Sequence, residues 1–270
     1  MKAGSRLGEV PNDIIKIITK ATDAACATAM KHYGLARASL KPDMTYVTAA
    51  DREIERALRK ELSRALPGAA VIGEEDGCGA AGVRGAAAKG WAWVIDPIDG
   101  TSAFIDGLPT FCVSVALFKD GRPVAGVLRL PATGDIYTAR RGGGAFYNGA
   151  PIRSAGPLSR HDLPICVPSK VHLRYKIAYQ GKTRNMGSTA LHFALVARGA
   201  AIAAVATAKI WDIAAAALIL TEAGGRVASL DGASVNWRSM LKTPELPAPP
   251  LLAASRSRWK TISALISPLK

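Results

Sequence analysis

The feature that most constrains the fold of this chain is a continuous apolar run that ends directly in acidic residues. Trp91 to Ile95 are all apolar, and the hexapeptide Asp96-Pro97-Ile98-Asp99-Gly100-Thr101 follows at once. Such a run is typical of a strand buried on both faces. We expect this strand to stop at Asp96-Pro97, because proline keeps its predecessor extended and supplies no donor. A strand of this kind needs a covering layer on each side.

The composition of the chain allows it to build such layers. Of its 270 residues, 49% are hydrophobic and 21% are charged, which excludes intrinsic disorder and predicts a substantial core. No apolar stretch approaches the ~18 to 20 residues that span a bilayer, and the first residues contain no signal-peptide core. The four cysteines form no C-x-x-C pair: Cys26, Cys78, Cys112 and Cys166. We therefore expect a cytoplasmic protein with no disulfide and no membrane partner.

Helical spacing, short apolar runs and turn residues predict the order of elements along the chain. Helices are expected over residues 12–33, 48–66, 188–198, 211–222 and 257–266. Strands are expected over 69–72, 91–95, 163–167, 201–208 and 251–255, with a meander over 111–146 and a hairpin over 226–235. Residues 78–90 are small and glycine-rich and predict a surface loop. The order predicts an α+β front domain over 1–150 and a back α/β domain over 151–270.

Charge is divided unevenly between the two ends of the chain, whose net charge is +14. Residues 1–112 hold 14 Lys+Arg and 14 Asp+Glu, whereas residues 113–270 hold 21 and 7. A basic second half attracts anions such as phosphate esters, nucleic acid or anionic lipid, without choosing among them. Nucleic acid is the weaker candidate because aromatic residues make up only 6% and the basic residues are scattered.

The segment from Trp91 to Phe118 contains three aspartates and no lysine or arginine. Two carboxylates three residues apart, Asp96 and Asp99, either raise a pKa or recruit a cation, and oxygen-only ligands favour Mg²⁺. Gly100 lets the backbone approach an anion, and Thr101 can open a helix whose free N–H groups face a phosphate. A plain Asp-Pro turn is the alternative for D-P-x-D taken alone.

Two further acidic positions can join this site. Glu74-Glu75-Asp76 follows the strand predicted at 69–72, so its carboxylates meet Asp96 if the two strands run in the same direction. Asp212 opens an alanine-rich helix and can face a shared cleft. Taken separately, the first is equally a solvated turn and the second a helix N-cap.

Three motifs of this chain together resemble those of the inositol monophosphatase family of Mg²⁺-dependent phosphatases. They are D-P-I-D-G-T, the upstream G-E-E-D and the downstream W-D-I-A-A-A-x-L-I-x-x-E-A-G-G. Further matches at 42–51, 137–149 and 187–191 extend the resemblance over nearly the whole chain. It implies a layered α-β-α-β-α sandwich with a mixed, largely antiparallel front sheet and a smaller back α/β sheet. It also implies a homodimer, lithium sensitivity and a small phosphorylated substrate.

The resemblance further implies roles for individual residues. Two or three Mg²⁺ ions would be held by Glu74, Asp96, the carbonyl of Ile98, Asp99 and Asp212. Glu74, Thr101 and Asp51 would form the catalytic set, with Asp51 supporting Thr101 while also capping its own helix. Substrate contacts would come from Gly100, Thr101, Ser102, Arg184, Gly187, Ser188 and Thr189.

The expected reaction is hydrolysis of a phosphomonoester by metal-activated water. Inositol, sugar or polyol phosphates are the first candidates for the substrate, and 3′-phosphoadenosine 5′-phosphate, histidinol phosphate and fructose 1,6-bisphosphate are rivals. Val205 stands where inositol-hydrolysing members carry a glutamate, which weighs against inositol specificity.

The non-enzymatic alternative is an RNA- or transcription-associated regulatory protein. A C-x₅-R match from Cys78 to Arg84 is taken as chance, because no histidine neighbours it.

Overall fold

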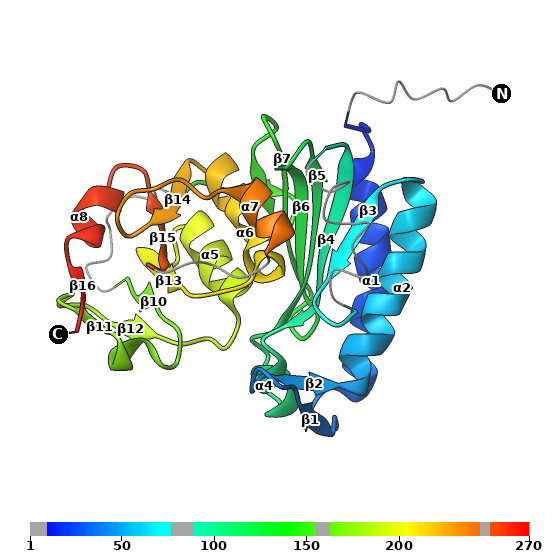
Figure 1. Ribbon diagram of the computed structural model, residues 1–270, viewed down its shortest axis with the longest axis horizontal. Coiled ribbons are helices and arrows are strands. Elements are labelled where there is room, and N and C mark those ends of the chain that lie inside the picture. The colour runs from blue at the N-terminus through cyan, green and yellow to red at the C-terminus, as the bar shows by residue number, and fades with distance from the viewer. Residues whose placement is uncertain (1–9, 77–88, 155–162, 244–248, 270) are drawn as a thin grey trace.

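The computed structural model describes residues 10–76, 89–154, 163–243 and 249–269 and has five layers (Figure 1). Helices α1 (Ile14–His32) and α2 (Ala49–Ala65) cover the outer face of a seven-stranded sheet. Helices α5 (Thr189–Ala197) and α6 (Ile210–Glu222) fill the space between this sheet and a five-stranded one. Helix α8 (Trp259–Ser263) lies on the far side. The predicted α-β-α-β-α sandwich is confirmed.

The front sheet has the order β3-β4-β5-β6-β7-β8-β9 and is antiparallel except for one pair. Its strands are β3 (Ala70–Gly73), β4 (Trp91–Asp99), β5 (Cys112–Lys119), β6 (Arg122–Leu130), β7 (Asp135–Arg140), β8 (Ala145–Tyr147) and β9 (Ala150–Pro151). The exception is the parallel pair β3 and β4, which places Gly73 opposite Ile95. The predicted meander is confirmed, and the parallel pair brings two acidic strand ends to the same edge.

The back sheet has the order β12-β10-β13-β15-β14 and mixes parallel with antiparallel pairs. Its strands are β10 (Ile165–Cys166), β12 (Thr183–Arg184), β13 (Ala203–Ala206), β14 (Gly225–Ser229) and β15 (Leu251–Ser255). Whether the two halves divide into domains at 150/151 stays a prediction. The hairpin predicted over 226–235 is confirmed only over a short stretch: the chain turns back after β14, with an antiparallel bridge between Ala228 and Ser234 and a hydrogen bond from the Ser229 N–H to the Ala233 carbonyl. Along its whole length β14 pairs instead with the buried strand β15.

Strand β4 also differs from the prediction, because it does not stop at Asp96-Pro97. The strand continues to Asp99, and the register with β5 shifts between Asp96 and Asp99. A bulge of this kind leaves a residue out of the hydrogen-bond ladder, which is where a strand tolerates proline. Both aspartates therefore stay on the rigid end of a central strand.

Some other elements end at residues different from those predicted, and some predictions fall outside the described residues. The last helix ends at Ser263, and Ile266–Pro268 form strand β16, which pairs with β11 (Tyr175–Ile177). The loop over 78–90 and the Cys78–Arg84 match fall almost wholly on residues 77–88, outside the described residues. Besides β11 and β16, the short elements not predicted are β9, β12, β1 (Ala38–Leu40), β2 (Tyr46–Thr48), α7 (Trp237–Lys242) and the 3₁₀ turn η1 (Val171–Leu173).

Alternating side chains of the front sheet form the cores on its two faces. On β5, Val113, Val115 and Leu117 pack toward α1 and α2, whereas Cys112, Ala116 and Phe118 pack toward α6. Helix α6 approaches the sheet closely, since a Cβ added to Gly126 on β6 would lie 3.0 Å from Ala215 Cα. The small residues of α6 are what allow this approach. It fixes the first turn of α6, and with it Asp212, against the ends of the sheet.

The predicted capping of α2 is confirmed. The N–H and the hydroxyl of Thr48 donate to Asp51 Oδ2 at 2.7 and 2.6 Å, and the Thr48 hydroxyl accepts from the N–H of Ala50. No helix among the described residues is long and apolar enough to cross a membrane. Cys26, Cys112 and Cys166 are buried and free.

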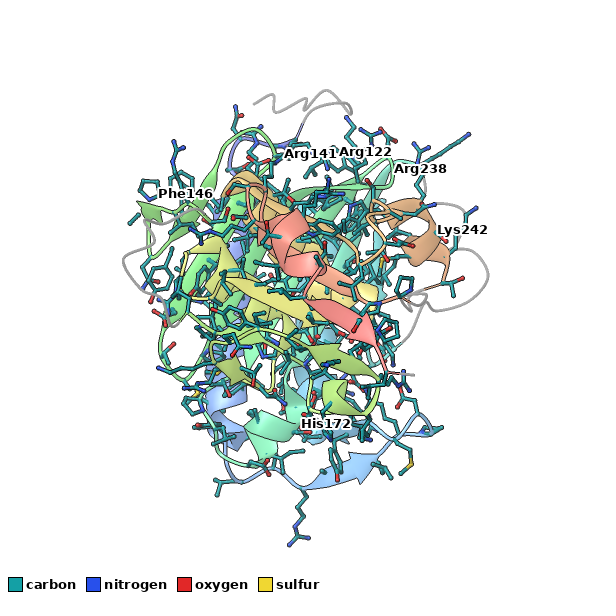
Figure 2. All side chains as sticks on the ribbon, turned by 90° about the vertical axis from the view of Figure 1, so that its left-hand side faces the viewer. Arg122, Arg141, Phe146, His172, Arg238 and Lys242 are labelled. Atoms are coloured by element: carbon teal, nitrogen blue, oxygen red, sulfur yellow. The ribbon has the colours of Figure 1, made fainter. Side chains whose placement is uncertain are left out.

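Three arginines of the second half lie together at one end of the molecule. In Figure 2, Arg122, Arg141 and Arg238 lie at the upper end of the view, away from His172, which lies lower down in the segment that follows β10.

Candidate active site

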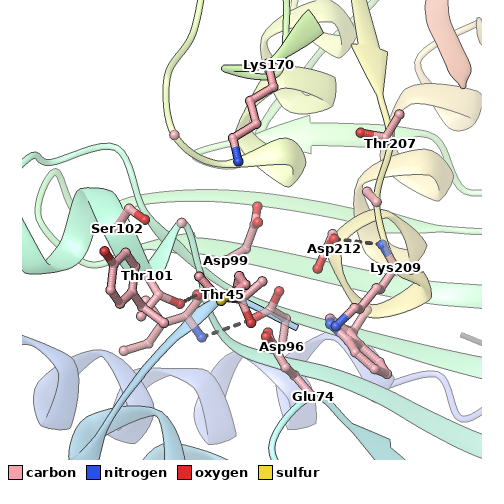
Figure 3. A pocket seen from close by; sticks show the side chains of 17 residues that line it. Thr45, Glu74, Asp96, Asp99, Thr101, Ser102, Lys170, Thr207, Lys209 and Asp212 are labelled. Atoms are coloured by element: carbon pink, nitrogen blue, oxygen red, sulfur yellow. Dashed lines mark hydrogen bonds between the residues drawn. The ribbon is translucent and has the colours of Figure 1, made fainter. Parts of the chain in front are cut away.

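A cavity of about 550 Å³ opens at the end of the parallel pair β3 and β4. It is lined by residues 44–46, Glu74, residues 96 and 98–102, Lys170, Gly187, residues 207–209, Trp211 and Asp212. Figure 3 shows the carboxylates on its floor and Lys170 reaching down from the opposite side. The short helix α4 (Thr101–Ile105) begins at its edge, where the sequence predicted that Thr101 opens a helix.

Three carboxylates from three elements meet in this cavity. One oxygen each of Glu74, Asp96 and Asp212 lies within 4.8 Å of the other two. Glu74 directly follows β3, Asp96 lies on β4, and Asp212 lies in the first turn of α6. The parallel register of β3 and β4 places the first two side by side, and the packing of α6 on the front sheet brings the third. The structure thus brings together residues that lie 138 positions apart in the sequence, from Glu74 to Asp212.

Burial leaves this cluster short of favourable partners. Asp96 is fully buried; its Oδ1 accepts the N–H of Ile98 at 3.0 Å, while its Oδ2 has no hydrogen-bond partner among the described residues. Burial, followed by repulsion from Glu74 and Asp99, raises the pKa of Asp96 well above its usual value. Burial and the charges of Asp99 and Glu74 likewise raise the pKa of Asp212, although the Lys209 N–H donates to it at 2.8 Å. Such a cluster binds either protons or a cation.

Asp99 lines the same cavity but directs its carboxylate elsewhere. Its Oδ2 accepts the Ser188 hydroxyl at 2.5 Å and the Ala190 N–H at 2.6 Å, and its Oδ1 is 3.4 Å from the Thr189 N–H. Burial raises the pKa of Asp99 to about 6, against the opposing effect of these hydrogen bonds. Asp99 therefore ties the N-terminus of α5 to the end of β4, and it is not one of the three clustered carboxylates.

Thr101 lies between two acceptors. Its hydroxyl oxygen is 3.1 Å from the carbonyl oxygen of Ile98 and 3.4 Å from Oδ1 of Asp51. Asp51 is buried and already accepts from Thr48, so its capping contact and its contact with Thr101 coexist. Burial raises the pKa of Asp51, and the bonds from Thr48 oppose the rise. This arrangement can direct the hydroxyl proton of Thr101 away from the cavity.

The residues predicted to contact substrate are only partly gathered here. Gly100, Thr101, Ser102 and Gly187 line the cavity. Gly100 has φ +96°, and a Cβ there would lie 3.2 Å from the carbonyl oxygen of Gly187, so only glycine lets the two loops approach. Ser188 and Thr189 face Asp99 instead, as described above. Arg184 is exposed, donates to the carbonyl of Thr183, and does not line the cavity.

Sequence analysis missed the cations that face the carboxylates. Lys41 Nζ lies 2.8 Å from Glu74 Oε1 and 2.6 Å from Glu75 Oε1, and Lys209 Nζ lies 2.6 Å from Asp43 Oδ2. Burial, opposed by Lys41, raises the pKa of Glu75 to about 7. The one available signal is that Lys41 directly precedes the matched stretch 42–51.

Glu55 on α2 was also missed, and it fixes the acidic turn. Its buried carboxylate accepts the N–H groups of Glu75 and Asp76 at 2.8 and 3.0 Å and is paired with Arg59. A Cβ on Gly73 would overlap this carboxylate, so a larger residue at the end of β3 would displace Glu55 from the N–H groups that it accepts. The turn that carries Glu74 is thus fixed to α2 by hydrogen bonds from its backbone to Glu55.

Comparison with known proteins identifies the family. Residues 11–266 match the model of the inositol monophosphatase family. The chain belongs to this family. An inositol-1-monophosphatase of Mesorhizobium japonicum is 41% identical over an alignment of 206 residues that covers 72% of this chain and 76% of that one. A histidinol-phosphatase of Mycobacterium tuberculosis is 36% identical over 217 residues, with 73% and 78% covered. The solved structure of a Thermotoga maritima IMPase superimposes with a TM-score of 0.79 at 27% identity and covers 94% of this chain and 96% of that one.

Family membership makes this chain an inositol monophosphatase-like phosphomonoesterase, as the motifs predicted. Its acidic cluster is a possible metal site, and a phosphorylated small molecule is the kind of substrate that the family implies. The described histidines take no part in the cluster: His192 is buried and accepts the Met186 N–H at 2.9 Å, while His32 pairs with Glu53 at the surface. Their predicted role in packing or at the surface fits these contacts.

Proposed function

We propose that this phosphatase hydrolyses a small phosphomonoester by a Mg²⁺-dependent mechanism with water as the nucleophile. The observation that carries the proposal is the convergence of Glu74, Asp96 and Asp212 around a buried, unpartnered oxygen of Asp96. The ligands are all oxygens, which suits a hard divalent cation. Bound there, Mg²⁺ would offset the mutual repulsion of the carboxylates, acidify a bound water and neutralise charge on the ester.

Asp99 and the carbonyl of Ile98 complete the ligand set in this proposal. Oδ1 of Asp99 has only the 3.4 Å contact with the Thr189 N–H, so it keeps capacity for a cation while Oδ2 holds α5. The cavity is large enough for a second or third ion beside the substrate phosphate. Asp99 then couples the metal site to the loop that carries Gly187.

Thr101 and Asp51 are proposed to orient the water that attacks the phosphorus. With its proton directed at Asp51 or the Ile98 carbonyl, the Thr101 oxygen offers lone pairs to a water in the cavity. Such a contact orients the water for attack on the phosphorus. Glu74, held by Lys41 and the turn anchored on Glu55, is placed to accept the other water proton.

The phosphate is proposed to lie over the start of α4. The first N–H groups of a helix have no intrahelical partner, so those of Gly100, Thr101 and Ser102 can donate to its oxygens. Lys170 lines the same cavity and adds a positive charge. Gly187, Ser188, Thr189 and Arg184 are proposed to contribute on the alcohol side.

The physiological ester is proposed to be an inositol, sugar or polyol phosphate, with histidinol phosphate, a nucleoside 3′,5′-bisphosphate and fructose 1,6-bisphosphate as the alternatives. The names of the two curated relatives support the first of these and histidinol phosphate. A cytoplasmic homodimer is part of the same proposal, and the three free, buried cysteines suit a reducing compartment.

Phosphate release from this panel of esters, with Mg²⁺ and with excess chelator, tests the proposal. We expect turnover only with the metal and expect Asp212→Asn to lower it by at least about a hundredfold, the range of effects for removing a group that supports the metal site. Asp231→Asn makes the same chemical change in an exposed turn and should leave turnover intact. Metal-independent release, or an Asp212→Asn enzyme as active as the wild type, contradicts the mechanism.

A further inference from the structure

We propose that the part of the alcohol farthest from the phosphate enters a second cavity beside the acidic one, and that this cavity selects a largely apolar ring bearing a negative charge. The inference rests on the proposed function and ranks an ester with such a ring above the polyol phosphates placed first there. It is carried by the lining of that cavity and by its continuity with the site.

The second cavity adjoins the acidic cavity. It has a volume of about 230 Å³ and shares Lys170 and Thr207 with the acidic cavity. A phosphate bound over the carboxylates would thus place its ester group at the entrance. Whole small-molecule sites start near ~300 Å³, so this space suits one part of a substrate rather than all of it.

Most of its wall is apolar. Val205 on β13 is 1% exposed and belongs to the core beneath α8, and Thr207 lies on the same face two residues later. The rest of the apolar lining comes from Pro168, Val171, Leu173 and Pro250. Among the described residues, the other polar lining residues are Lys170, Arg174 and Tyr175, and none of these is a carboxylate or amide. These side chains can pair with some hydroxyls of a polyol, but hydroxyls that face the apolar wall would lose water without replacement, a cost that a largely apolar ring avoids.

The segment that supplies most of this wall is positively charged. Residues 163–211 contain no aspartate or glutamate, and they include Lys170, Arg174, Lys176, Lys182, Arg184, Arg198 and Lys209. Within the described parts of the chain, neither Lys170 nor Arg174 forms an ion pair or a side-chain hydrogen bond, and Figure 3 shows the Lys170 ammonium directed toward the carboxylates of the acidic cavity. Lys209, which faces the acidic cavity, is neutralised by Asp43. Arg174, together with Lys170 where the two cavities meet, attracts a negative group on the ring and repels an ammonium.

A matched series of esters tests this selection on the full-length protein with Mg²⁺. Benzyl phosphate, 4-carboxybenzyl phosphate and 4-(aminomethyl)benzyl phosphate share the same leaving oxygen and differ in the charge on the ring, and inositol 1-phosphate supplies the polyol. We expect kcat/KM to be highest for the carboxybenzyl ester and lowest of the three for the aminomethyl ester. The ratio of these two should be at least about tenfold, the size expected for contacts with two exposed cations. It should shrink as ionic strength rises.

Two substitutions at one exposed position locate the effect. Arg174→Gln should reduce the carboxybenzyl-to-aminomethyl ratio several-fold, and Arg174→Glu should reduce it by at least about tenfold. Lys176→Glu is the matched control, because Lys176 lies two residues further along the chain, is also exposed, and lines neither cavity. It should leave the ratio within about twofold of the wild type, the change allowed for an exposed charge that is screened by solvent and salt.

The outcomes separate the two proposals. If no ester in the series releases phosphate with Mg²⁺, the proposed function itself fails. If phosphate is released but the three benzyl esters react alike, or if inositol 1-phosphate is far better than all of them, only the second-cavity inference is overturned. Equal effects of Arg174→Glu and Lys176→Glu overturn it as well, since they would place the charge effect at the general surface.

Discussion

Replacing Asp96 with asparagine should stabilise the metal-free protein while abolishing its response to Mg²⁺. The ligand oxygens of Glu74, Asp96 and Asp212 lie within 4.8 Å of one another, and Asp96 is fully buried. Two unit charges at that separation repel by about 3 kcal/mol at an effective dielectric constant near 20. Partial protonation of the cluster relieves part of this, and we expect a net gain of about 2 kcal/mol in the free energy of unfolding.

The asparagine fits the site that the carboxylate leaves. Its carbonyl oxygen can keep the 3.0 Å bond from the Ile98 N–H, and its amide NH₂ would take the place of the unpartnered Oδ2, facing the carboxylates of Glu74 and Asp212. No cavity is created, because the two side chains have nearly the same shape. The gain corresponds to a rise of roughly 4 to 8 °C in Tm for a chain of this size.

Thermal unfolding in chelator and in a series of Mg²⁺ concentrations measures both effects. Wild-type protein should gain about 2.7 kcal/mol at a metal concentration a hundred times its Kd, whereas Asp96→Asn should gain almost nothing. Asp231→Asn, in an exposed turn, controls for the chemical change and should behave as the wild type in both conditions. An Asp96→Asn protein that is less stable than wild type in chelator, yet still stabilised by Mg²⁺, would refute the account of the cluster.

Three further predictions test the scaffold and its charge. Gly100→Ala should cost about 1–3 kcal/mol in stability and most of the activity, because φ is +96° and the added Cβ meets the Gly187 carbonyl. The control is Gly134→Ala, at φ +74° in open space, which should keep full activity in the same phosphate-release assay. Thr48→Ala should cost about 1 kcal/mol by denaturant unfolding, since it removes the cap of α2, and Thr48→Ser should restore it. In chelator, Tm should fall as the pH rises from about 4 to about 7. Folding raises the pKa of Asp99 from 3.8 to about 6 and that of Glu75 from 4.5 to about 7, so over this range the folded state holds protons that the unfolded chain has lost. Mg²⁺ should make this fall smaller, and a Tm that rises over the same range contradicts the prediction.

Local signals were strong enough to predict most elements and the residues of the acidic cluster. Apolar spacing and glycine stops identified α1, α2 and α6, and the run before Asp96 identified β4. These elements are predictable because the spacing of apolar residues along the chain sets which positions of a helix or strand are buried. The bulge in β4 and the pairing of β14 with β15 were not predictable in this way. They depend on which strand lies alongside, and a short segment does not carry that information.

The sequence by itself determined which chemistry this protein carries, since motifs with carboxylates, glycines and a threonine at fixed spacings need only local geometry to be recognised. Only the tertiary structure decided how those groups are used. It brought Asp212 to Glu74 across 138 positions, turned Asp99 toward the start of α5, and paired Lys41 with Glu74. It also placed Lys170 and Arg174 beside a largely apolar cavity, where neither has an ion-pair partner among the described residues. The physical reason is that burial and charge pairing depend on distances in space, which packing sets and spacing along the chain does not.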